Sequence, residues 1–127
     1  MSQQRALRMS LLADGAGTGL FGIVVLAGGQ GLAGAIGVPG SWIVPIGVGM
    51  LAGAVLLLVF SGHAAMPRIA ATVNAVAGVA MTVLALGGIL PLTGLGVAFM
   101  LAGAVWVVAF AVLVTVLLRR AVSAEAH

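Results

Sequence analysis

Residues 95–118 read LGVAFMLAGAVWVVAFAVLVTVLL, an apolar run of 24 residues in which Thr115 is the only hydroxyl, amide or ionisable side chain. A helix needs about 20 predominantly apolar residues to cross the hydrocarbon core of a bilayer. A membrane β-strand would instead alternate apolar and polar residues over about 10 positions. Within lipid, a continuous apolar segment satisfies its own backbone hydrogen bonds only as a helix. The run therefore predicts a transmembrane helix.

Three further apolar runs precede this one, and segments containing glycine, proline or serine separate them, as is typical of turns. We predict four transmembrane helices, at about residues 9–28, 42–60, 69–90 and 95–118. Short connections favour antiparallel neighbours. The expected fold is an all-α integral membrane four-helix up-down bundle, with residues 1–127 in a single membrane domain.

The composition supports this class of protein. Hydrophobic residues make up 63% of the chain and charged residues 6%, whereas soluble domains carry about 25% charged residues. Such a chain cannot cover a soluble surface with polar groups, nor does it resemble a disordered chain or a nucleic-acid binder. Cysteine is absent, which excludes disulfides and thiolate metal sites.

The arginines predict the orientation. In the four-helix arrangement they all fall on one side of the membrane: Arg5, Arg8, Arg68, Arg119 and Arg120. The loops on the other side contain no lysine or arginine. Because basic residues are enriched in cytoplasmic loops, we expect a multi-pass protein of the bacterial plasma (inner) membrane with both termini in the cytoplasm.

Each predicted helix also carries small residues at a spacing that suits close packing. Helices in lipid associate through close backbone approach, which small side chains permit. The expected packing residues are Gly15, Gly19, Gly49, Gly53, Ala71, Ala75, Ala98 and Ala102. These faces can pack within one bundle or can dock a partner subunit.

The hexapeptide MLAGAV occurs twice, at residues 50–55 and 100–105. Chance can produce this recurrence in a chain rich in alanine, glycine, valine and leucine. A duplicated two-helix hairpin would also produce it.

The predicted membrane helices contain one ionisable side chain, Asp14. Asp14 lies six positions after Arg8, and Asn74 lies six positions after Arg68. The first and third helices run in the same direction, so this equal spacing places Asp14 and Asn74 at one depth, about 9 Å from the arginines. We expect a polar layer there with these members: Asp14, Asn74 and Thr115, with Arg68 or Arg119 within reach.

Three roles are open for Asp14. It can be a structural carboxylate that accepts hydrogen bonds from Asn74 and from an arginine. It can be a neutral carboxylic acid, which burial away from water favours. It can also bind a proton or a cation during transport, because ionisable groups inside membranes often mark ion pathways.

No catalytic pattern is recognisable in the sequence. Asp14 and Glu125 are the only acidic residues, so paired-carboxylate chemistry is excluded. His63 and His127 have no neighbouring ligands at metal-binding spacing. We expect a protein that is not an enzyme and that has no cofactor, no metal and no nucleic-acid partner.

Several short motifs resemble a family of uncharacterised small bacterial membrane proteins with four transmembrane helices. They are the first-helix segment ADGAGTG (residues 13–19), the loop segment GVP (residues 37–39) and the third-helix segment VNA (residues 73–75). The family has no established activity, so the resemblance implies architecture only.

The resulting functional hypothesis is a structural or accessory membrane subunit that packs through glycine- and alanine-rich helix faces. Its expected partners are the lipid bilayer and either a second copy or a larger membrane complex. The alternative is a small proton- or cation-coupled transporter or channel component that uses Asp14.

Overall fold

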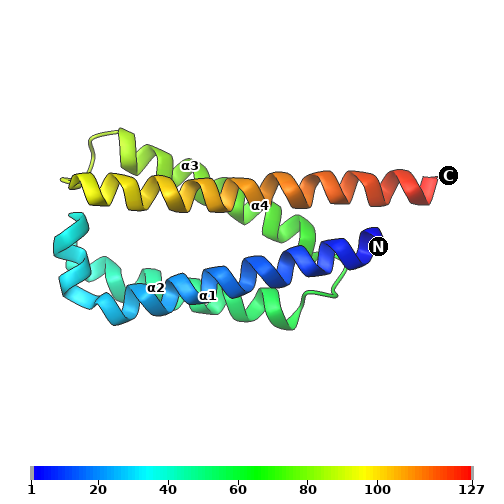
Figure 1. The fold of residues 1–127 in the computed structure, drawn as a ribbon, viewed down its shortest axis with the longest axis horizontal. Helices are drawn as coiled ribbons and strands as arrows, with labels where there is room; N and C mark the ends of the chain where they lie inside the picture. The colour runs from blue at the N-terminus through cyan, green and yellow to red at the C-terminus, as the bar shows by residue number, and fades with distance from the viewer. Residues whose placement is uncertain (1, 127) are drawn as a thin grey trace.

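The computed structural model describes residues 2–126, and these form four α-helices and one short 3-10 helix. The elements are α1 (Gln3–Ile36), η1 (Gly40–Trp42), α2 (Ile43–Val59), α3 (Met66–Leu86) and α4 (Gly94–Ala126). Four helical segments, the second formed by η1 together with α2, are long and apolar enough to cross a membrane. The beginning of α1 and the end of α4 lie at the same end of the bundle (Figure 1).

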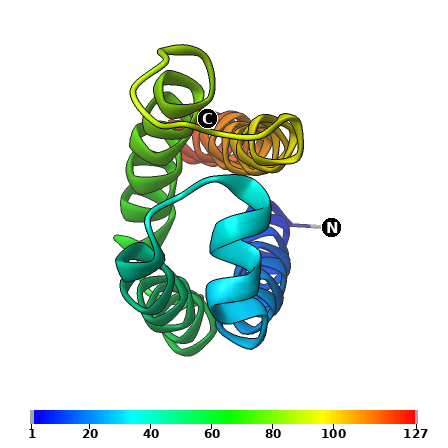
Figure 2. The ribbon, with the colours of Figure 1, turned by 90° about the vertical axis from the view of Figure 1, so that its left-hand side faces the viewer.

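The bundle consists of two helical hairpins. α1 packs along α2, and α3 packs along α4, while α1 and α4 join the two hairpins. α1 and α3 touch only locally. Figure 2 views the bundle from the end that holds η1 and shows the four helices arranged around a common axis.

Glycines allow the close contacts within each hairpin. A Cβ atom added at Gly19 of α1 would lie 3.3 Å from the Cβ of Ala54 in α2. A Cβ atom added at Gly78 of α3 would lie 2.6 Å from Val108 in α4. In a bilayer, helices gain little from hydrophobic burial against each other, so such close approaches stabilise their association.

The first and last helices of the chain extend beyond the predicted spans. The first continuous stretch of α1 ends at a break at Gly29 (φ 52°, ψ −140°), directly after the predicted end at residue 28, and a second helical stretch follows as far as Ile36. Glycine adopts this positive φ without the steric cost of a Cβ atom. α4 continues through Arg119 and Arg120 to Ala126, past the predicted end at residue 118.

At the end opposite the arginines, a threonine holds the two hairpins together. The backbone N–H of Thr93 donates to the carbonyl of Ile36 over 3.1 Å, and its hydroxyl donates to the carbonyl of Ala35 over 2.6 Å. The same hydroxyl accepts from the N–H of Gly96 over 3.0 Å, which caps the first turn of α4. Gly96 lies against the Ile36 carbonyl so closely that a Cβ atom would overlap it.

Candidate functional site

Asp14 is completely buried within the bundle, with 0% of its surface exposed. The hydroxyl of Thr18, one turn later on α1, donates to one carboxylate oxygen over 3.1 Å. The side-chain amide of Asn74 on α3 donates to the other oxygen over 2.8 Å. Both oxygens are therefore hydrogen-bonded, as a buried polar group requires.

The bond from Asn74 to Asp14 connects the two hairpins near the arginine-bearing end. Asn74 is itself buried, and it belongs to a helix that otherwise barely touches α1. Together with the Thr93 cap at the opposite end, it gives the α1–α2 and α3–α4 hairpins a polar contact at each end.

A layer of apolar side chains separates Asp14 from the arginine-bearing end. Leu11, one turn before Asp14, and Val114 on α4 are both 0% exposed. They belong to one core cluster with Leu7, Met66 and other buried residues. Between Asp14 and this end of the bundle, the core is therefore lined by buried apolar side chains.

The other members of the predicted polar layer lie elsewhere. The Thr115 hydroxyl donates to the carbonyl of Ala111 in its own helix over 2.7 Å. Arg68 and Arg119 are exposed. Among residues 2–126, the side-chain hydrogen bonds of Asp14 come from Thr18 and Asn74, not from an arginine. The structure thus joins Asp14 and Asn74 by a hydrogen bond, and the remaining three residues make no hydrogen bond to Asp14 among residues 2–126.

The eight small residues that we expected to pack divide into two sets. Three lie against neighbouring side chains: Gly15 against Leu57 and Leu58, Gly19 against Ala54, and Ala71 against the arginine-end core. Five face open space or are exposed: Gly49, Gly53, Ala75, Ala98 and Ala102.

One aromatic contact was not predicted from the sequence. The indole of Trp106 on α4 lies so close to Gly17 on α1 that a Cβ atom at residue 17 would overlap the ring. The Trp106 ring also stacks with Phe110 and meets Phe21 edge to face, with centroid distances of 4.9 and 6.4 Å. Its Nε1 is buried and has no hydrogen-bond partner in the described part of the chain. The glycine at residue 17, opposite a large ring, is the only sequence signal for this contact.

The chemistry available to this site is hydrogen bonding and proton or cation binding by one carboxyl group. Within residues 2–126, no cluster of three His, Asp or Glu side chains is positioned to hold a metal ion. The arrangement therefore fits a structural contact or an ion-binding group.

Comparison of the chain with protein-family models, with curated proteins and with solved structures finds no match. The resemblance to small four-helix bacterial membrane proteins stays a prediction.

Proposed function

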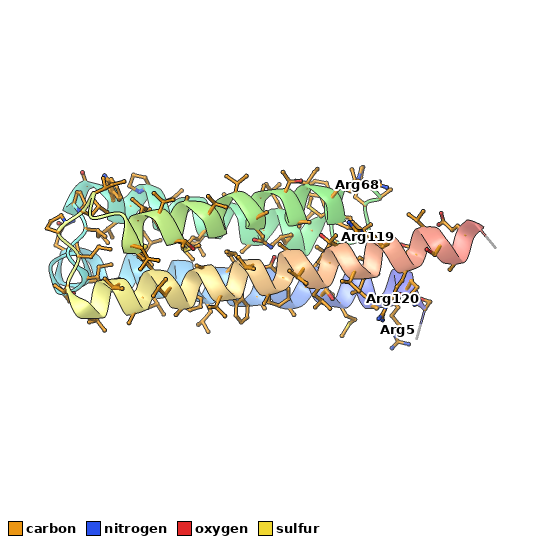
Figure 3. The ribbon with its side chains drawn as sticks, turned by 90° about the horizontal axis from the view of Figure 1, so that it is seen from above. Arg5, Arg68, Arg119 and Arg120 are labelled. Carbon is orange, nitrogen blue, oxygen red and sulfur yellow. The ribbon has the colours of Figure 1, made fainter. Side chains whose placement is uncertain are left out.

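We propose that this chain is a non-enzymatic accessory module of a bacterial inner membrane, which its helices cross four times in an up-down sense. Four helical segments of spanning length and composition support this proposal. The labelled arginines gather at the end where α1 begins and α4 ends (Figure 3). By the positive-inside rule, this end and both termini belong on the cytoplasmic side.

The observation that supports a role in assembly is an open face of α2. Gly49 and Gly53 are one turn apart and share a face, and a Cβ atom added at either would meet nothing within 4 Å. The neighbouring Val48 is 53% exposed. Because glycines let a second helix approach closely in lipid, we propose that this face packs against a second copy or against another membrane subunit.

The test is the mass of the particle purified in mild detergent. We expect a particle heavier than one chain, and we expect Gly53→Leu to dissociate it, because leucine would fill the space that a partner helix uses. Ala109→Leu, at an exposed alanine of α4, is the matched control and should leave the mass unchanged.

Two results would contradict the proposal. A strictly monomeric wild-type particle without a co-purifying protein would exclude a role in assembly. Dissociation by Ala109→Leu but not by Gly53→Leu would move the contact from α2 to α4.

A second candidate function is a proton- or cation-coupled component that uses Asp14. The observation that favours it is a fully buried carboxyl group that receives polar contacts from two helices. An ion that approaches Asp14 from the arginine-bearing end would have to pass the buried apolar cluster that contains Leu11 and Val114.

Ion flux into liposomes distinguishes the two candidates. A transport role predicts a flux in wild type that Asp14→Asn abolishes, because the amide cannot exchange a proton. Equal flux from both proteins, or none from either, would remove this candidate and leave the assembly role untouched.

A further inference from the structure

A cavity of about 660 Å³ opens at the arginine-bearing end of the bundle. Its lining comes from the first turns of α1, the turn between α2 and α3, the start of α3 and the last turns of α4. It is distinct from the Asp14 site, because the core cluster around Leu11 and Val114 lies between them.

The cavity carries an excess of positive charge. Arg5, Arg8 and Arg68 line it, and Glu125 is the only acidic residue in its lining. All three arginines are exposed. Arg5 and Arg68 lie on opposite sides of this end of the bundle (Figure 3). Guanidinium groups bind phosphate oxygens with two parallel hydrogen bonds, so the chemistry of the cavity suits a phosphate group.

A second, shallower groove begins at the same arginine. It has a volume of about 300 Å³ and is lined by Arg68, Ile69, Thr72 and Val73 on the outer surface of α3. Ile69 and Val73 are 52% and 59% exposed, so this groove offers apolar contact outside the bundle. A soluble phosphate would use the cavity alone, whereas a phospholipid would fill the cavity with its headgroup and the groove with an acyl chain.

We infer that this end of the chain binds an anionic phospholipid, with the phosphate in the cavity that Arg5, Arg8 and Arg68 line and an acyl chain along Ile69 and Val73. Basic pockets between transmembrane helices are known to take such headgroups. The inference rests on the proposed membrane placement but not on the proposed assembly contact. Its test can therefore fail while the assembly role stands.

The experiment is a titration of the full chain in detergent with phosphatidylglycerol, with the lipid-bound fraction measured by native mass spectrometry. Phosphatidylcholine with the same acyl chains is the second probe, and soluble glycerol phosphate is the third. We expect phosphatidylglycerol to bind at least about tenfold more tightly than either, since only it combines an uncompensated negative charge with acyl chains.

The double variant Arg5→Gln, Arg68→Gln should weaken phosphatidylglycerol binding about 30-fold, or about fivefold for each arginine. The matched control is Arg119→Gln, Arg120→Gln, which removes the same charge at the same end from residues that do not line the cavity. We expect the control to change binding by less than about fivefold.

Three results would overturn the inference. Equal losses in the two double variants would show general electrostatic attraction and no defined site. Equal binding of phosphatidylcholine and phosphatidylglycerol would exclude charge recognition. Equally tight binding of glycerol phosphate would exclude the acyl groove. Because the wild-type comparison of the three probes needs no variant, a variant that fails to fold leaves the inference testable.

Discussion

Replacing Asp14 with leucine removes, among residues 2–126, the one buried side chain that accepts hydrogen bonds from two helices. Two donors lose their acceptor, the Thr18 hydroxyl and the Asn74 amide. The threonine can recover, because Thr72, Thr82 and Thr115 each donate to the carbonyl four residues earlier at 2.7–2.8 Å. Asn74 has no such alternative, since its amide points across to α1.

The expected loss in the free energy of unfolding is therefore the cost of one stranded donor, about 1–2 kcal/mol. Leucine also removes a carboxyl group that is costly to insert into a membrane, which reduces the net loss. The coupling between Asp14 and Asn74 is free of that second effect. Interhelical hydrogen bonds in a membrane protein average about 0.6 kcal/mol and reach about 1.7 kcal/mol, so the coupling should fall in this range.

The assay is a double-mutant cycle of Asp14→Leu and Asn74→Leu, with reversible unfolding followed in mixed detergent micelles. We expect the double variant to be less destabilised than the sum of the two single variants. A cycle of Asp14→Leu with Thr115→Val is the control and should be additive, because Thr115 bonds to its own helix. Strict additivity of the Asp14 and Asn74 changes would show that the bond does not join the hairpins and would refute the reasoning.

Two further predictions concern glycines between α1 and α4. Gly96→Ala should lower the free energy of unfolding by about 1–3 kcal/mol, because its Cβ atom would overlap the Ile36 carbonyl. Gly94→Ala is the control and should change the free energy of unfolding by less than about 0.5 kcal/mol, because a Cβ atom at residue 94 meets open space. Equal effects of the two changes would show that Gly96 does not pack against Ile36. Gly17→Ala should displace the Trp106 ring and shift its fluorescence emission, measured in a protein in which Trp42 is replaced by phenylalanine. An unchanged emission spectrum would show that the Trp106 ring does not lie against residue 17.

The number of helices follows directly from the apolar runs, but their ends do not. The predicted last helix ends at residue 118, just before Arg119 and Arg120, whereas α4 continues to Ala126. Arginine is a good helix former, so it marks where the chain leaves the hydrocarbon and not where the helix stops. In α1 the break at Gly29 agrees with the predicted end at residue 28, but the sequence did not indicate the second helical stretch, which passes Gly31 and Gly34 and ends at Ile36.

The contact between Asp14 and Asn74 could be anticipated from the sequence because both are six positions from an arginine on parallel helices. The same spacing could not show whether Arg68 or Arg119 forms a hydrogen bond with Asp14. Long basic side chains near a helix end extend toward water, where their charge is solvated at little cost. Both side chains are exposed, and Thr18, close to Asp14 on the same helix, donates in their place.

The contacts of Gly17 and Gly96 could not be predicted from the sequence. Each depends on which residue of α4 or α1 comes opposite, and this depends on the rotation and register of whole helices. A chain with 20 glycines offers many such positions. GxxxG spacing selected Gly49 and Gly53 as readily as Gly15 and Gly19, although only the latter two contact another helix of this chain.

The repeated hexapeptide MLAGAV relates the two hairpins to each other. Ala54 and Ala104 occupy the same place in the two copies, and both are buried, with 3% and 5% of their surface exposed. Ala54 lies against Gly19 of α1, and the Ala104 carbonyl lies 3.9 Å from a Cβ atom built at Gly78 of α3. In each hairpin an alanine of the repeat therefore lies near a glycine of the preceding helix, as in a duplicated hairpin, although the nearest neighbours of Gly78 are Val108 and Val107.

A duplication with two-fold symmetry would also pair α2 with α3 in the way that α1 pairs with α4. The structure departs from that symmetry, because α1 and α4 pack along each other while α2 and α3 make few contacts. Both α2 and α3 lack the neighbour that this symmetry would give them, and of the two it is α2 whose Gly49 and Gly53 face open space. In lipid, a small-residue face gains stability only from another helix that approaches it. The open glycine face is the physical reason to propose an assembly contact on α2 and to use α4 as the control.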